Sequence, residues 1–118
     1  PSEGVIVSSF SPSKGKKGLD IRGKLGQSVI AAAPGNVVYS GSGLIGYGNL
    51  VIIKHNDTYL SAYGHNRRLL VKEGTAVKQG QKIAEMGDSG KEGVILHFEI
   101  RRDGKPVNPL SYLPKRRD

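Results

Sequence analysis

The sequence contains neither cysteine nor tryptophan and only two phenylalanines. Without cysteine, the chain can form no disulfide and no thiolate-bound zinc site. Because the aromatic side chains that stack on bases are scarce, we expect no nucleic-acid partner. No segment approaches the roughly 20 consecutive apolar residues of a membrane-spanning helix. Any attachment to a membrane is therefore expected to come from a lipid anchor outside this chain.

A helical period is also missing, because glycine interrupts each window in which one begins. Glycine accounts for 17 of the 118 residues, about twice its ordinary share. Short alternating segments separated by turn signals instead predict an all-β fold, mainly an antiparallel sheet with little or no helix. We expect one domain over residues 1–118, with a basic tail at 114–118. Because the chain begins abruptly at Pro1, we interpret it as the C-terminal fragment of a longer protein.

The charge that is present is mainly positive: 18 Lys and Arg residues against 10 Asp and Glu residues give a formal net charge of +8. A basic surface favours polyanionic partners, among them the anionic polymers of a cell wall. The basic residues are spread over the whole chain, so ordinary solvated surface charge also accounts for them.

The segment 94–100 is the clearest strand in the sequence. Its alternate positions, beginning with Val94, are apolar and suit a core face. The opposite face carries Ile95, His97 and Glu99. An imidazole beside a carboxylate can serve a functional site, whereas Ile95 is an aliphatic residue on a polar face. We expect Ile95 either to be an exposed contact residue or to be covered by a flexible loop at 87–93.

Histidine and aspartate side chains on three expected strands could meet at one site. Asp20 lies on the polar face of a short strand, and a strand at 58–65 places Tyr63 and His65 on one face. One Asp and two His side chains can bind a divalent metal such as zinc. Three histidines in a small domain can equally be structural, and we interpret His55 as a structural residue at a strand end. The spacing alone leaves both interpretations open.

Five short motifs resemble, in this order, those of the LytM or lysostaphin-type zinc endopeptidases. They are Lys-Lys-Gly-Leu-Asp-Ile at 16–21, Gly-Tyr-Gly-Asn at 46–49, Tyr-Gly-His at 63–65, Leu-His-Phe-Glu-Ile at 96–100 and Asn-Pro-Leu at 108–110. Together they span nearly the whole chain. The resemblance implies a β-rich fold of the duplicated hybrid-motif type with an open groove across a sheet. It also implies peptidoglycan cross-bridge peptides as the ancestral substrate.

Compared position by position with the active enzymes, this sequence retains some residues of the zinc site and has other residues in place of the rest. Asp20 and His97 match two zinc ligands of the active enzymes, and His65 matches the histidine of a Tyr-x-His element that orients water. Lys16 stands where the remaining ligand, a histidine, is expected. Ile95 stands at the first histidine of a His-x-His pair, which helps to stabilise the oxyanion.

These two departures predict a degenerate site with no bound metal, no cofactor and no hydrolysis. A catalytic zinc ion needs about three protein ligands, and only the relic ligands Asp20 and His97 remain. Protonated Lys16 has no lone pair for a metal. Ile95 cannot donate to an oxyanion, a loss that typically costs about 10²–10³ in rate. We hypothesise that the Lys16 ammonium replaces the charge of the metal by pairing with Asp20.

The degenerate pattern is most similar to the NlpD-like murein hydrolase activators of this family. That resemblance implies a periplasmic domain, tethered to the outer membrane as part of a longer lipoprotein. It implies activation of N-acetylmuramoyl-L-alanine amidases during bacterial division and daughter-cell separation, with peptidoglycan as the second partner. The alternatives are a residual zinc endopeptidase that cleaves peptidoglycan peptides and a passive peptidoglycan-binding module.

Without the chemistry, the groove itself becomes the candidate partner-binding site. We expect it to be lined by charged, aromatic and aliphatic side chains: Lys16, Asp20, Tyr47, Tyr63, His65, Ile95 and His97. Tyrosine and aliphatic side chains beside charges are typical of protein–protein contacts. The loop at 41–49, which contains four glycines, either flanks this groove or only connects two strands.

Overall fold

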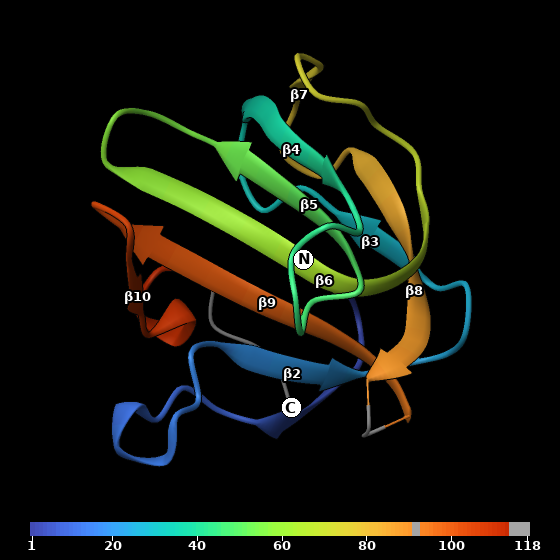
Figure 1. The fold of residues 1–118 in the computed structure, drawn as a ribbon, viewed down its shortest axis with the longest axis vertical. Helices are drawn as coiled ribbons and strands as arrows, with labels where there is room; N and C mark the ends of the chain where they lie inside the picture. The colour runs from blue at the N-terminus through green and yellow to red at the C-terminus, as the bar shows by residue number, and fades with distance from the viewer. Residues whose placement is uncertain (91–92, 114–118) are drawn as a thin grey trace.

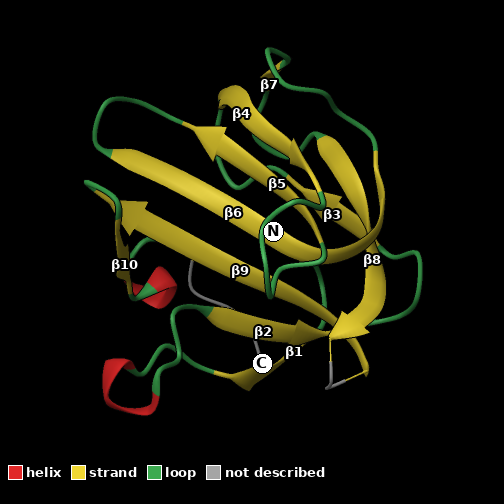
Figure 2. Cartoon of the chain, viewed as in Figure 1, coloured by secondary structure: helices red, strands yellow, loops and turns green. Residues whose placement is uncertain are grey.

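The computed structural model describes residues 1–90 and 93–113, and this part of the chain is built almost entirely of strands (Figure 2). The strands are β1 (Val5–Ser8), β2 (Leu19–Arg22), β3 (Ser28–Ile30), β4 (Gly35–Gly41), β5 (Asn49–Lys54), β6 (Tyr59–Leu69), β7 (Ala76–Val77), β8 (Lys82–Gly90), β9 (Gly93–Arg102) and β10 (Lys105–Val107). The helical elements of the described chain are two short 3₁₀ turns, η1 (Pro12–Lys14) and η2 (Pro109–Ser111). The prediction of an all-β fold with little helix is therefore confirmed.

All these strands belong to one antiparallel sheet in which β9 has a central place. The order is β1-β2-β9-β8-β6-β5-β4-β7, with β10 on β9, β3 on β8 and an additional β9–β6 pairing. Figure 1 shows β9 running between β2 and β6. The register of β2 sets Asp20 opposite His97, and the register of β6 sets Gly64 opposite the same residue. Residues far apart in the sequence thus meet at one point on β9.

One face of β9 packs into the hydrophobic core. Leu96 and Phe98 are fully buried there, in one cluster with Leu19 of β2 and Tyr63 of β6. Burying side chains of this size stabilises the fold by about 1.5–3 kcal/mol each. The alternation predicted over 94–100 is confirmed, because all of its even positions lie in or against this cluster.

Strand β6 does not keep the simple alternation that the sequence predicts. Tyr63 faces the core, whereas His65 faces the other side, with its ring centroid 6.2 Å from that of His97. His65 has a φ of 65°, and β6 advances three residues between the Tyr63 and Asn66 pairings while β5 advances two. Such a bulge turns the next side chain to the opposite face of the sheet. The prediction that Tyr63 and His65 share a face is therefore wrong.

Part of the segment expected to be a loop at 87–93 is strand. β8 continues to Gly90, and Gly87 pairs with Ile95 across the hairpin. Gly87 has no room for a side chain, because an added Cβ would lie 2.6 Å from the carbonyl oxygen of His65. The close approach of two backbones at this glycine lets β8 pass beside both β6 and β9.

Two expectations fall on parts of the chain that are not described. Residues 91–92, which belong to the loop expected at 87–93, and the basic tail expected at 114–118 lie outside the described residues. Among the residues that are described, no helix is long and apolar enough to cross a membrane. The single domain expected over 1–118 stays a prediction.

Candidate functional site

A cavity of about 330 Å³ lies on the face of β9 opposite the core. Its lining comes from the segment before β2, the loop at 41–49 and strands β2, β6, β8 and β9. Six of the seven side chains expected in the groove line it: Lys16, Asp20, Tyr47, His65, Ile95 and His97. The loop at 41–49 therefore flanks the groove. We call this space the His97 cavity.

The seventh residue, Tyr63, does not line the cavity, so its assignment to the groove is wrong. Its side chain is fully buried on the core face of β6. Its hydroxyl accepts a hydrogen bond from the Ala32 amide at 2.9 Å and shares another with Ser61 Oγ at 2.7 Å. Burial raises the pKa of Tyr63 to about 12. Tyr63 is thus an uncharged structural residue behind the groove floor.

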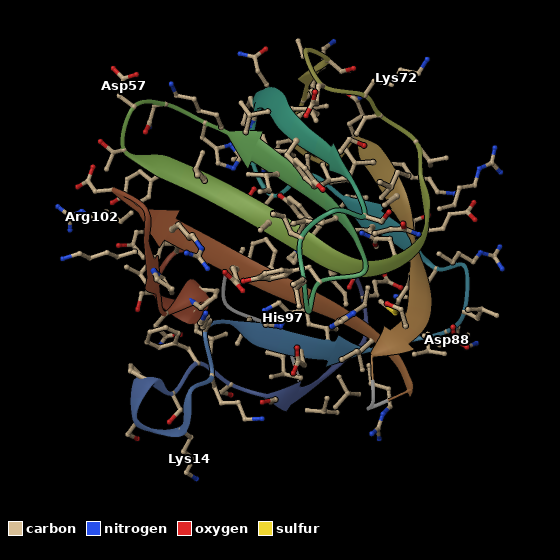
Figure 3. The ribbon with its side chains drawn as sticks, viewed as in Figure 1. Lys14, Asp57, Lys72, Asp88, His97 and Arg102 are labelled. Atoms are coloured by element: carbon tan, nitrogen blue, oxygen red, sulfur yellow. The ribbon has the colours of Figure 1, made fainter. Side chains whose placement is uncertain are left out.

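His97, labelled in Figure 3, lines the cavity from β9, and carboxylates hold both of its ring nitrogens. Nδ1 lies 2.6 Å from Asp20 Oδ1, and Nε2 lies 2.7 Å from Glu99 Oε2. Burial alone would lower the pKa of His97, but the hydrogen bonds to the two carboxylates raise it to about 9. At neutral pH the imidazole is therefore protonated, and both nitrogens donate.

Glu99 extends this arrangement into a network of charged and polar groups. It is 1% exposed, and Oε1 accepts a hydrogen bond from Arg101 Nε at 2.9 Å. Oε2 accepts a second one from the Tyr47 hydroxyl at 2.9 Å, beside the bond from His97. Burial raises the pKa of Glu99, but the hydrogen bonds from His97, Arg101 and Tyr47 outweigh it and lower that pKa. Glu99 is thus a buried carboxylate with a full set of donors.

Sequence reasoning placed Glu99 beside His97 but gave it no role, and it missed Arg101 altogether. The signal was available, because alternate residues of β9 share a face, and Arg101 follows Glu99 by two positions. A buried acid flanked by two cations on one strand face is the pattern of a hydrogen-bonded ion network. We call Asp20, His97, Glu99, Arg101 and Tyr47 the groove network.

The Lys16 ammonium does not pair with Asp20, so the hypothesis that it replaces the metal's charge in this way is wrong. Lys16 is exposed, and it forms no ion pair within 4.0 Å with any of the described residues. Its backbone is held in a tight turn by hydrogen bonds with Ser11. The cation that meets Asp20 is His97, because the β2–β9 register sets these two residues directly opposite each other.

His65 forms the wall of the cavity beside His97. Its left-handed backbone conformation is uncommon for a non-glycine residue and costs free energy, which the surrounding structure must offset. Its Nδ1 lies 3.0 Å from Ser89 Oγ. Burial lowers the pKa of His65, and the nearby charge of His97 lowers it further. The two neighbouring histidines therefore differ in charge at neutral pH.

Ile95 lines the cavity but is only 2% exposed. Of the two alternatives, the exposed contact residue is wrong. Ile95 is covered, and its backbone is paired with Gly87 on β8 and Arg22 on β2.

In residues 1–90 and 93–113, no group of three or more His, Asp or Glu side chains is arranged to hold a metal ion. Asp20 and His97, the two relic ligands, do lie together, but they hydrogen-bond to each other. What the arrangement offers chemically is a cavity floor whose charges are internally paired.

Comparison with known proteins places this geometry in a family. The model of Peptidase family M23 matches residues 14–109. The chain is 64% identical over 117 residues to the lipoprotein NlpD/LppB homolog of Pseudomonas aeruginosa and 59% identical over 117 residues to the murein hydrolase activator NlpD of Escherichia coli strain K12. These alignments cover 98% of this chain but 39% and 31% of the two relatives, so the chain spans about a third of their length.

Solved structures show the same fold. A zinc-containing peptidase from Vibrio cholerae superposes with a TM-score of 0.84 at 34% identity, covering 94% of this chain and 37% of that one. A catalytic-domain mutant of the prophage-encoded M23 protein EnpA from Enterococcus faecalis gives 0.83 at 34% identity, covering 95% and 93%. Lysostaphin from Staphylococcus simulans gives 0.85 at 27% identity, covering 92% and 48%. Since the family model spans most of the chain and the relatives are this similar, the chain belongs to peptidase family M23 and carries its LytM-type domain.

Proposed function

We propose that this domain is a non-catalytic activator of cell-wall N-acetylmuramoyl-L-alanine amidases that acts in bacterial division and daughter-cell separation. The name of the Escherichia coli relative, a murein hydrolase activator, supports an activating role connected with peptidoglycan. Amidases are the class of murein hydrolase that the proposal selects as the direct partner. Peptidoglycan is the second partner, as the substrate on which the activated enzyme works.

The single observation that carries the proposal is that His97 has no free ring nitrogen. Its Nδ1 is held by Asp20 at 2.6 Å and its Nε2 by Glu99 at 2.7 Å. A histidine binds a metal through the lone pair of an unprotonated nitrogen. With both nitrogens donating to carboxylates, the groove network satisfies the charges that a metal ion would otherwise meet.

The place of the third zinc ligand supports the same conclusion. Lys16 occupies it, and its ammonium lies exposed in a turn. A catalytic zinc ion needs about three protein ligands and an open position, whereas this donor set supplies two that are bonded to each other. The residues present therefore do not fit a catalytic zinc ion, and we derive no hydrolytic step for this chain.

The names of the relatives support a location in the cell envelope. Several are called lipoproteins, and that of Haemophilus influenzae is called an outer membrane antigenic lipoprotein. These names support an envelope-associated role for this chain. We propose a periplasmic location with attachment to the outer membrane through a lipid anchor outside the chain.

A second candidate function, a residual zinc endopeptidase, is favoured by one observation. Asp20, His65 and His97 still line one cavity, in a fold shared with a zinc-containing peptidase. Weighed against it are the missing third ligand and the closed bonding of His97. A passive peptidoglycan-binding module is the third alternative, supported by the net charge of +8 alone.

Release of dye from labelled peptidoglycan separates these functions. The domain, a cell-wall amidase from the same bacterium, and the two together are each incubated with the labelled wall. Activation predicts release that rises well above the sum of the separate reactions only when both proteins are present. Release by the domain alone that disappears in Asp20→Asn would establish the endopeptidase. Sedimentation with the wall and no effect on the amidase would establish the passive module.

A further inference from the structure

A second cavity, of about 320 Å³, lies beside the His97 cavity on the same side of the sheet. Its walls are almost entirely apolar: Leu44, Leu50, Ile52, Leu60 and Ala62, with Tyr47, Glu99, Arg101 and Gly104 at its edge. Leu60 and Ala62 belong to the face of β6 that points away from the core. We call this space the apolar cavity.

The two cavities adjoin each other, because Tyr47 and Glu99 line both of them, and we call the two cavities together the groove. The Tyr47 hydroxyl donates to Glu99 Oε2 at 2.9 Å. The backbone of Tyr47 is held as well, since its carbonyl accepts from the His65 amide at 2.7 Å. Tyr47 is thus a fixed divider, with a polar space on one side and an apolar space on the other.

The polar end carries positive charge that the domain itself does not neutralise. The carboxylates of Asp20 and Glu99 are already met by His97 and Arg101. Lys16 and Lys17 line the cavity and are exposed, and among the described residues neither forms an ion pair within 4.0 Å. Two uncompensated ammonium groups at the mouth of a cavity attract an anionic group.

Two adjacent aliphatic side chains of the loop at 41–49 are exposed to solvent where they line the two cavities. Leu44, on the rim of the apolar cavity, is 44% exposed, and Ile45, on the rim of the His97 cavity, is fully exposed. Adjacent exposed aliphatic residues next to an apolar hollow mark a surface that another molecule covers. Positive charge at one end and an unfilled apolar hollow at the other define the chemistry of that molecule.

We propose that this groove binds a segment of the amidase that presents an acidic side chain to Lys16 and Lys17 and a large apolar side chain to the apolar cavity. This inference rests on the proposed function and deepens it. The charge complementarity selects an acidic partner, and the hollow beside Ala62 selects one with a bulky aliphatic or aromatic anchor. A peptide stem of the wall offers carboxylates but no large apolar side chain, so the apolar cavity favours the protein.

Variants at the two ends test the two contacts separately. Lys16→Glu with Lys17→Glu reverses the polar end, and Leu44→Asp places a charge on the rim of the apolar cavity. Leu44 is a loop residue outside the core cluster, so its substitution leaves the sheet intact. Ala62→Leu fills the hollow from its floor. Lys72→Glu with Lys78→Glu is the matched control, because both double variants lower the net charge from +8 to +4. Figure 3 shows Lys72 far from His97.

Affinity for the purified amidase is measured by titration calorimetry at two salt concentrations. We expect the double lysine variant to bind about tenfold or more weakly, with a smaller loss on adding salt than the wild-type domain shows. Leu44→Asp and Ala62→Leu should each weaken binding about tenfold with an unchanged salt dependence. The control pair should bind within about twofold of wild type, since its charges lie outside the groove.

The outcomes separate this inference from the proposed function. If the wild-type domain does not stimulate the amidase, the proposed function fails. If it stimulates but the groove variants all bind like wild type, the two-ended groove is wrong while the function stands. If the lysine variant loses sedimentation with amidase-free peptidoglycan but keeps its affinity for the amidase, the polar end holds a wall carboxylate, and the inference is overturned.

Discussion

His97 and His55 are both held at their two ring nitrogens, but by partners of opposite kind in different regions of the sheet. His97 contacts the carboxylates of Asp20 and Glu99 on the cavity side. His55, just after β5, contacts the carbonyl of Pro34 at 2.7 Å and the hydroxyl of Ser61 at 2.7 Å. Histidine is thus a partly buried cation in one region and a link between uncharged groups in the other.

The His55 contacts continue as a chain of hydrogen bonds behind the groove floor. Because the Pro34 carbonyl can only accept, Nδ1 of His55 donates to it, and Nε2 shares a hydrogen bond with Ser61 Oγ. Ser61 Oγ shares another with the Tyr63 hydroxyl, which accepts from the Ala32 amide. These contacts support the interpretation of His55 as a structural residue at a strand end.

The two regions are stabilised by different kinds of interaction. The groove network depends on charge, because each of its buried carboxylates must meet a cation. The chain through His55 depends on matching donors with acceptors, because its partners are dipoles in a tightly packed core. The regions lie on opposite faces of β6 and β9, so changes can be made in one without touching the other.

Removing the buried acid should produce the largest effect. Glu99→Ala leaves His97 and Arg101 as neighbouring cations without their shared counter-ion, and we expect a loss of about 3–5 kcal/mol in the free energy of unfolding. Urea titration of both proteins at pH 7 measures it. Glu85→Ala is the control, because Glu85 pairs with Arg67 on the surface and surface pairs contribute little. Equal losses in the two variants would remove the distinction between the network and a surface ion pair.

A smaller loss is expected from the uncharged region. Tyr63→Phe keeps the ring but leaves the Ala32 amide and the Ser61 hydroxyl without their partner, at a cost of about 1–3 kcal/mol. Tyr112→Phe, at a half-exposed tyrosine, should change stability far less. Amide hydrogen exchange reports the site directly, because the Ala32 amide should exchange faster in Tyr63→Phe alone. Unchanged exchange would show that the hydrogen bond contributes nothing to this region.

The pH dependence of stability should separate the two regions further. The folded-state pKa of His97 is raised to about 9 from an ordinary 6.5, so the folded protein binds more protons than the unfolded chain between these values. The stability that His97 contributes is complete below about pH 6.5 and is lost as the pH rises through 9. We expect a decline of about 3 kcal/mol over this window, because one pKa unit corresponds to about 1.4 kcal/mol. The decline should disappear in His97→Gln, and a decline of the same size in that variant would contradict the assignment.

The strand pattern allowed much of the fold to be predicted from the sequence. The alternation over 94–100 identified the core face of β9, and the motif order brought Asp20, His65 and His97 to one cavity. These features could be predicted because they depend on local periodicity and on family resemblance. Only part of the groove network could be predicted from the sequence. The pairing of Glu99 with Arg101 could be predicted only if Glu99 were known to be buried.

Two predictions failed because they depended on geometry that a linear pattern does not contain. The bulge at His65 turns the His65 side chain to the face opposite Tyr63, which stays on the core face. In the linear pattern only the adjacent Gly64 indicates this bulge. The pairing of Lys16 with Asp20 failed because the sheet register sets His97 opposite Asp20, while Lys16 stays in an exposed turn. Charge alone identified a possible partner, but the register decided which cation reached the acid.

Zinc binding to the purified domain tests the central claim most directly. If the internally paired charges of the groove network have taken the place of a metal, calorimetric titration at pH 7 should show no stoichiometric zinc site of micromolar affinity. Thermal unfolding should likewise be unchanged by zinc or by a chelator. One zinc ion bound per chain at micromolar affinity, and lost in Asp20→Asn, would contradict the account.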